Sequence, residues 1–252
     1  MYFKFNDINI YYEKYGISKQ TILILPGWGN TRETFKNIIN NLKENYTIYI
    51  LDYPSFGKSS IPKVTLSIYD YALLIKAFIT SNNIKSPHII AHSFGGRITS
   101  LLIGYYKIDV KKVILIDVAG IKRRKNINSY LKEKIYKLLK KLTFLLPTKK
   151  RIIYQRKLFY NFASKDYQNI NTKMQQTFKN IINEDLRKYY KEISNETLLI
   201  WGEKDIDTPY KDALLLNRII KNSALITYKN SYHFPYLDYQ NNIINVIKYF
   251  LK

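Results

Sequence analysis

The sequence predicts an α/β protein, with helices on both faces of a mostly parallel β-sheet. Short apolar runs alternate with amphipathic helical stretches up to about residue 120 and again after residue 195. Several of these runs end in turns that contain glycine or proline, as strands do where they leave a buried sheet. With 252 residues, 46% of them hydrophobic, the chain can bury a large core as a single unit.

The predicted strands before residue 120 are short runs of apolar or alternating residues. They are Tyr2–Phe5, Ile8–Tyr15, Thr21–Leu25, 46–51, 87–91 and Lys112–Ile116. The first two are typical of a hairpin, and the others follow the pattern of buried strands. Helices are expected over residues 31–44, with Thr31 as the capping residue, over residues 67–81, and directly after Gly96.

The alternation stops between Gly120 and Ser194, where the periodicity is helical. Helices are expected over 152–162, 174–182 and 184–192, and an apolar stripe beside lysines precedes them, ended by Pro147. The stripe consists of Leu131, Ile135, Leu138, Leu139, Leu142 and Leu145. Strands resume at 197–201 and 225–228. We therefore expect a core of residues 1–120 and 195–252, with a helical cap (121–194) inserted between the sixth and seventh strands.

A candidate nucleophile lies where the strand at 87–91 gives way to a helix. Residues 91–95 are Ala-His-Ser-Phe-Gly. A serine on such a sharp turn has a strained backbone, and its hydroxyl projects from the end of the sheet. Residues two before and two after it must be small because other backbone passes close by, and Ala91 and Gly95 meet this need. The motif alone is weak, since an ordinary glycine turn also fits it, but its position favours Ser93.

The base can be chosen by elimination, because the chain has three histidines. His88 lies within a predicted strand and is expected to be a packed strand residue. His92 adjoins the serine, and neighbouring side chains on a strand diverge, so its ring is poorly placed to reach the hydroxyl. His233 lies in a loop after the last predicted strand, from which it can reach the end of the sheet. We therefore predict His233 as the general base.

The acid that orients the histidine should lie between serine and histidine in the sequence. The strand at 197–201 runs into Gly-Glu-Lys-Asp-Ile-Asp-Thr-Pro, which offers Asp205 and Asp207. Asp117, at the end of the preceding strand, is a third candidate. A buried carboxylate at this place fixes the imidazole tautomer and stabilises the imidazolium that forms during the reaction. The loop position favours Asp205.

Taken together and in order, these segments resemble the α/β-hydrolase superfamily over nearly the whole chain. Residues 25–29 (Leu-Pro-Gly-Trp-Gly) look like its oxyanion loop, 91–96 like its nucleophile elbow, 201–205 like its acid loop and 231–234 like its histidine loop. The resemblance implies an eight-stranded sheet and places the acid on Asp205 rather than Asp207. It also implies an oxyanion hole made by the backbone N–H groups of Trp28 and Phe94. One departure is Pro26, where the family usually has histidine.

The resemblance implies a serine hydrolase that cleaves carboxylic esters, with no metal and no organic cofactor. Thioesterase, lactonase, carbon–carbon hydrolase and acyltransferase activities use the same three residues and stay open. A second interpretation is an esterase for acyl groups on an acidic carrier protein, docked by Arg123, Arg124, Lys125, Lys149, Lys150 and Arg151. A third is a ligand-binding or scaffold protein on a hydrolase fold. Arg97, just after the elbow, could meet an anionic substrate, although a helix-surface position is favoured.

The net charge of +22 is the most unusual property of the composition. It is compatible with an acidic partner, but the lysines are scattered and no nucleic-acid-binding motif is present, so compositional bias is the favoured explanation. The N-terminal residues do not resemble a secretory signal, and no apolar run is long enough to span a bilayer, so we expect a cytoplasmic protein. The apolar stripe beside lysines would suit an anionic membrane surface. The favoured interpretation is that the stripe faces the active-site pocket.

Overall fold

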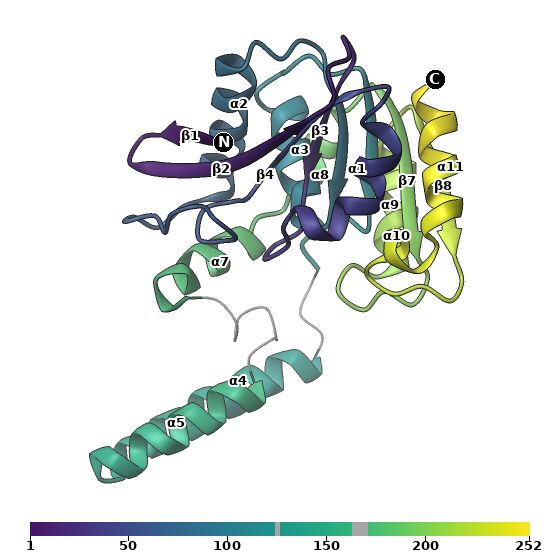
Figure 1. Cartoon of the computed structure of the whole chain (residues 1–252). Helices are drawn as coiled ribbons and strands as arrows, with labels where there is room; N and C mark the ends of the chain where they lie inside the picture. The colour runs from purple at the N-terminus through teal and green to yellow at the C-terminus, as the bar shows by residue number, and fades with distance from the viewer. Residues whose placement is uncertain (124–126, 163–170) are drawn as a thin grey trace.

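The computed structural model describes residues 1–123, 127–162 and 171–252. Within these ranges, eight strands form one sheet in the order β1-β2-β4-β3-β5-β6-β7-β8 (Figure 1). They are β1 (Tyr2–Phe5), β2 (Ile8–Tyr15), β3 (Thr21–Leu25), β4 (Thr47–Leu51), β5 (His88–His92), β6 (Lys112–Ile116), β7 (Glu196–Gly202) and β8 (Ser223–Tyr228). The pairs β1–β2 and β2–β4 are antiparallel and the remaining neighbours are parallel. The predicted sheet is confirmed.

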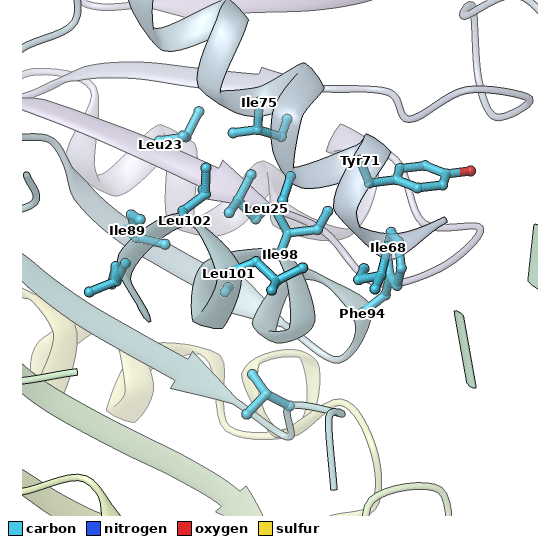
Figure 2. Packing of buried hydrophobic residues seen from close by; sticks show 14 of the residues in the cluster. Leu23, Leu25, Ile68, Tyr71, Ile75, Ile89, Phe94, Ile98, Leu101 and Leu102 are labelled. Carbon is cyan, nitrogen blue, oxygen red and sulfur yellow. The ribbon is translucent and has the colours of Figure 1, made fainter. Parts of the chain in front are cut away.

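Helices cover both faces of the sheet, as the alternation of strands and helices predicts. One face packs against α2 (Ile68–Ser81), α3 (Phe94–Gly104), α8 (Arg187–Tyr190) and α9 (Tyr210–Ile219). The opposite face packs against α1 (Lys36–Leu42), α10 (Pro235–Asp238) and α11 (Gln240–Leu251). Because side chains alternate along a strand, Ile89 belongs to the first layer and Ile90 to the second. Figure 2 shows the first layer, where Ile75, Ile98 and Leu102 pack over the strands.

Two helix starts differ in how they are capped, and the capping hydrogen bond expected of Thr31 is not formed. Ser67 accepts a hydrogen bond from the backbone N–H of Asp70, and the Asp70 carboxylate accepts one from the N–H of Ser67, which forms a capping box. Thr31 occupies the N-cap position of a short 3-10 helix (η1, Arg32–Phe35), but its side chain makes no capping hydrogen bond. The expected helix over 31–44 is therefore divided into η1 and α1.

The described residues between β6 and β7 form helices and connecting turns. These are α4 (Ile127–Leu142), η2 (Thr143–Leu145), α5 (Thr148–Phe162), η3 (Thr172–Met174), α7 (Gln175–Ile182) and α8. The helix expected over 184–192 is present only as α8, because backbone groups of the residues before α8 form hydrogen bonds with residues outside the helix. The carbonyl of Glu184 accepts a hydrogen bond from Arg97, and the N–H of Leu186 donates to Gly120. The division into core and cap remains a prediction.

The apolar stripe is largely exposed and none of its residues lines the cavity beside Ser93, so the favoured interpretation, that it faces the active-site pocket, is wrong. Its six side chains are between 36% and 83% exposed. Figure 1 shows α4 and α5 side by side, projecting from the layered part of the molecule. The side-chain amide of Gln155 in α5 donates to the Thr143 hydroxyl at 2.9 Å. The rings of Tyr136 in α4 and Phe162 in α5 are 5.6 Å apart, so the two helices contact each other while the stripe stays exposed. Across the described ranges, no helix has the length and apolar character required to cross a bilayer.

Candidate active site

Ser93 occupies a sharp turn between β5 and α3, with φ of 46° and ψ of −111°. A positive φ is unfavourable for a residue with a Cβ, so this turn stores strain that its surroundings must hold in place. Its N–H donates to the carbonyl of Ile116 at 3.1 Å. A Cβ added to Gly95 would lie 2.0 Å from the carbonyl oxygen of Leu25, so only glycine fits there without moving β3. The turn predicted from the sequence is therefore present, with its serine at the end of the sheet.

The structure brings Ser93, His233 and Asp205 together from three separate loops. The Ser93 hydroxyl lies 3.0 Å from Nε2 of His233, and Nδ1 of His233 lies 2.7 Å from Oδ2 of Asp205. A carboxylate only accepts hydrogen bonds, so Nδ1 carries the proton and Nε2 is free to accept from the serine. The three groups in line have the geometry required of a nucleophile, a base and a group that fixes the tautomer of the base, and these roles remain a prediction.

The acid loop is built to hold Asp205 as a carboxylate. Burial raises the pKa of Asp205, but hydrogen bonds from His233 and Thr208 outweigh burial and leave the pKa below its ordinary value. The Thr208 hydroxyl donates to Oδ2 at 2.5 Å, and the N–H groups of Asp207 and Thr208 donate to Oδ1 at 2.8 and 3.0 Å. The indole N–H of Trp201 donates to the Thr208 carbonyl and fixes the loop to β7.

The two rival acids have different surroundings. Asp207 has an exposed side chain, and it supports Asp205 through its backbone N–H. Asp117 is fully buried at the end of β6, with Oδ1 accepting from the N–H of Gly202 at 3.0 Å. Burial first, and then the Asp205 carboxylate nearby, raise the pKa of Asp117 from 3.8 to about 10. Asp117 is thus a neutral carboxylic acid at pH 7 and Asp205 is the ionised member of the pair.

Replacing Asp117 by asparagine should change how stability depends on pH. The ordinary carboxyl pKa is near 4 in the unfolded chain, so the folded protein binds one more proton between about pH 4 and pH 10. The contribution of this proton to stability is complete below about pH 4 and is lost as the pH rises toward 10. The asparagine side chain does not titrate in this range, and it keeps an oxygen for the N–H of Gly202. We expect the melting temperature of Asp117→Asn, relative to wild type, to increase by at least about 2–4 °C between pH 5 and pH 9.

Calorimetric scans of both proteins at the two pH values measure this difference directly. The comparison of variant with wild type cancels the titration of groups that the two proteins share. A difference that is constant with pH, or that decreases toward pH 9, would show that Asp117 is already ionised in the folded protein at pH 5.

The other two histidines, His88 and His92, are buried, and burial lowers the pKa of each ring. His92 donates from Nε2 to the carbonyl oxygen of His233 at 2.8 Å, and their rings are 4.8 Å apart. Burial first, and then the neighbouring His233, lower the pKa of His92 to about 3, so its ring is neutral. His88 is buried in β5, as expected, and burial lowers its pKa to about 4. His92 thus holds the loop that carries His233.

A cavity of about 250 Å³ opens beside the serine. It is lined by Trp28, Ser93, Phe94, Arg97, Ala119, Phe178, Ile181, Ile182, Asp207, Thr208 and His233. Phe94 is the first residue of α3, so its N–H is among those without a partner inside the helix. The Trp28 ring packs edge-on against Phe94 and forms part of the cavity wall. An oxyanion hole made by the N–H groups of Trp28 and Phe94 remains a prediction.

A larger hollow of about 690 Å³ adjoins this cavity, since both are lined by Ile182 and Asp207. Its wall carries Lys122, Arg123 and Arg187, of which Arg123 is paired with Asp212 and Arg187 with Asp185. Ser93 and His233 line the smaller cavity and not the larger hollow.

Arg97 does not lie on a helix surface, and the favoured prediction for this residue is wrong. It is 6% exposed, and its Nη1 donates to the carbonyl oxygens of Ile181 and Glu184, each at 3.0 Å. These acceptors are 84 and 87 residues away in the sequence, so the pattern around the elbow carries no sign of them. Arg97 ties α3 to the end of α7 and forms part of the cavity wall.

One group of side chains among the described residues has the geometry to hold a metal ion. It consists of Asp117, Asp205 and His233, whose ligand atoms lie within 4.8 Å of one another. The contact between His233 and Asp205 already satisfies both atoms as a hydrogen bond, and Asp117 is protonated. The group therefore suits proton transfer better than cation binding.

The supporting roles of three residues were not predicted from the sequence, although Asp117 was a third candidate for the acid. Thr208 and His92 act through hydrogen bonds to Asp205 and His233, and Asp117 is a neutral neighbour of the acid. A signal existed for Thr208, because a threonine three residues after an aspartate in a loop can bond to its carboxylate. No comparable signal exists for His92, since its partner is 141 residues away.

Comparison with known proteins identifies a family and individual proteins to which this chain is similar. Residues 20–239 match the family described as "alpha/beta hydrolase fold". The pimeloyl-[acyl-carrier protein] methyl ester esterase of Wigglesworthia glossinidia brevipalpis is 25% identical, over 94% of this chain and 95% of its own. A 2-hydroxy-6-oxononadienedioate/2-hydroxy-6-oxononatrienedioate hydrolase of Pseudomonas putida is 24% identical, over 97% and 92%. The structure of an esterase from Exiguobacterium antarcticum has a TM-score of 0.74 at 22% identity, covering 97% of this chain and 96% of that one.

Proposed function

Because the chain belongs to the α/β-hydrolase fold family, we propose that it is a serine hydrolase that cleaves carboxylic esters or related acyl bonds. The observation that carries the proposal is the line of atoms from the Ser93 hydroxyl through the His233 ring to the Asp205 carboxylate. A hydroxyl is a weak nucleophile unless a base removes its proton as it attacks, and His233 is placed to do so. The relatives named as esterases support ester bonds as the substrate class.

The proposed reaction has two steps. The Ser93 oxygen attacks the ester carbonyl while Nε2 of His233 takes the serine proton, and the N–H groups of Trp28 and Phe94 hold the negative oxygen. His233 then passes the proton to the leaving alcohol, and the acyl group stays on Ser93. In the second step His233 takes a proton from water and the water oxygen attacks the acyl carbon. The bond between that carbon and the Ser93 oxygen then breaks, the carboxylic acid leaves, and His233 returns the proton to Ser93. Asp205 stays ionised throughout and stabilises the imidazolium.

The proposal is tested by hydrolysis of p-nitrophenyl esters of increasing acyl length, combined with covalent labelling by a fluorophosphonate. We expect turnover of the esters and a single added phosphonyl group on the peptide that contains Ser93, found by mass spectrometry. The cavity of about 250 Å³ should favour short or medium acyl chains. A folded protein that neither turns over esters nor reacts with the probe would contradict the proposal and favour a ligand-binding or scaffold role.

The second candidate is an esterase for acyl groups attached to an acidic carrier protein. It is favoured by the relative named as a pimeloyl-[acyl-carrier protein] methyl ester esterase. Of the basic residues predicted to dock the carrier, Arg123 lies beside the outer hollow but is paired with Asp212, and Lys149, Lys150 and Arg151 lie in α5. Arg124 and Lys125 lie outside the described residues. If the carrier docks by charge, KM for a carrier-linked methyl ester should rise steeply with salt, and a salt-independent KM would exclude this candidate.

A further inference from the structure

Residues 127–162, here called the helical hairpin, carry apolar side chains that the protein itself leaves uncovered. Leu131, Ile135, Leu138 and Leu142 recur at helical spacing on one face of α4, and each is between 48% and 59% exposed. Phe144 and Leu145 in η2 are 62% and 83% exposed. Continuous apolar surface of this kind on a folded protein marks a site of interaction.

The exposed stripe is not the seam that holds the two helices together. That seam includes the hydrogen bond from Gln155 to Thr143 and the contact of the Tyr136 and Phe162 rings, whose centroids are 5.6 Å apart. Thr143 is buried, whereas the described side chains of α5 include none that is buried. Since the helices already contact each other through other residues, the stripe is available to a partner.

The charge of the helical hairpin identifies what kind of partner fits. Residues 127–162 contain ten Lys and Arg and one Glu, a net charge of +9, and the remaining residues carry the other +13. Closure of the hairpin onto its own core, or pairing with a second copy of the chain, would bring like charges together. An anionic partner is favoured instead.

The position of the lysines favours a lipid surface over other anions. At 100° per residue, Lys132 and Lys141 lie about 90° to either side of the centre of the stripe. Both are exposed. A helix at a bilayer surface buries its apolar face among the acyl chains while flanking lysines extend to the phosphate groups. Nucleic acid offers no surface that would bury a row of leucine side chains.

We propose that the helical hairpin binds the surface of an anionic phospholipid bilayer, with the stripe of α4 inserted between lipids and its flanking lysines on the headgroups. Neither helix crosses the bilayer, in agreement with the lack of a spanning helix in the described ranges. The proposal does not depend on esterase activity, because membrane binding is measured without substrate.

The test is co-sedimentation of the full chain with vesicles of phosphatidylglycerol and phosphatidylcholine. We expect binding at low salt that decreases in about 1 M salt and on vesicles of phosphatidylcholine alone. Each lysine near an anionic surface contributes a factor of roughly five, so replacement of four lysines should weaken binding about 600-fold. The charge variant is Lys132→Gln, Lys141→Gln, Lys149→Gln and Lys150→Gln. Its matched control, with the same change in net charge on exposed lysines outside the hairpin, is Lys4→Gln, Lys19→Gln, Lys85→Gln and Lys221→Gln.

Two further variants address insertion itself. Leu138→Ser should reduce binding at least about tenfold, because one leucine is no longer buried in the lipid. The side chain is exposed, so the fold should be unchanged. In Leu138→Trp, lipids with brominated acyl chains should quench the new tryptophan fluorescence.

Three results would overturn the proposal. They are absence of sedimentation with anionic vesicles at low salt, equal loss of binding in the charge variant and its control, and unchanged binding of Leu138→Ser. Binding of a soluble acidic protein that depends on the hairpin lysines but not on Leu138, without vesicle binding, would likewise overturn it and assign the surface to a protein partner.

Discussion

Replacing Ser93 by alanine is expected to lower kcat/KM for p-nitrophenyl esters about 10⁶-fold, the loss typical when a serine nucleophile is removed from such a triad. The reason is that no other oxygen is placed 3.0 Å from the Nε2 atom of His233 among the described residues of the cavity wall. Alanine keeps a Cβ at the positive φ of this turn and adds no bulk, so the fold should persist. Steady-state kinetics and the melting temperature measure both effects.

The control for this variant is Ser81→Ala, which removes an exposed hydroxyl at the end of α2. It should have wild-type kinetics, and it should still react with the fluorophosphonate. Ser93→Ala should not react with the probe at all. Turnover of Ser93→Ala within about tenfold of wild type would mean that another group attacks the ester, and the assignment of the nucleophile would be wrong.

Replacing Asp205 by asparagine is expected to lower kcat about 10⁴-fold, with a much smaller change in KM. The amide N–H can donate a hydrogen bond to Nδ1 of His233, which favours the tautomer that carries its hydrogen on Nε2. In that tautomer His233 cannot accept the proton of Ser93. The asparagine also lacks the charge that stabilises the imidazolium, so both effects act on the reaction and not on substrate binding.

Asp117→Asn is the matched control, because it makes the same chemical change on the neighbouring carboxyl group. Asp117 is already neutral at pH 7, since burial and Asp205 raise its pKa to about 10. We expect its kcat to stay within about threefold of wild type. The opposite result, with activity lost in Asp117→Asn and kept in Asp205→Asn, would contradict the assignment. It would mean that Asp117 is the ionised acid and that Asp205 carries the proton.

Much of the fold can be predicted from the sequence because the strands of this sheet are buried on both faces. A strand such as β4, in which every residue is buried, requires a short run that is almost wholly apolar, and such runs are visible without a structure. The three residues proposed to react are predictable for a similar reason. They lie in loops directly after β5, β7 and β8, and parallel strands end at the same edge of the sheet.

The incorrect predictions share a physical cause, which is dependence on contacts between distant residues. Arg97 is buried because carbonyl groups near the end of α7 accept its hydrogen bonds, and nothing near Arg97 in the sequence indicates them. The stripe of α4 has the amphipathic pattern of a helix with a buried face. The pattern shows which side of the helix is apolar, but not whether another part of the chain covers that side. Leu138, at 59% exposed, shows that none does among the described residues.

The position of His233 beyond the last strand also affects when, during folding, the site is completed. The hydroxyl of Ser93 and the ring of His233 meet across 140 residues of sequence, and β8, which precedes His233, lies at the edge of the sheet. The line of atoms at the site therefore requires β8 in place, because the loop that carries His233 follows this strand. Bringing the two residues together also costs the entropy of closing a long loop. If the proposed esterase activity is present, its recovery after dilution from denaturant would report the joining of β8 to β7, and not only collapse of the core.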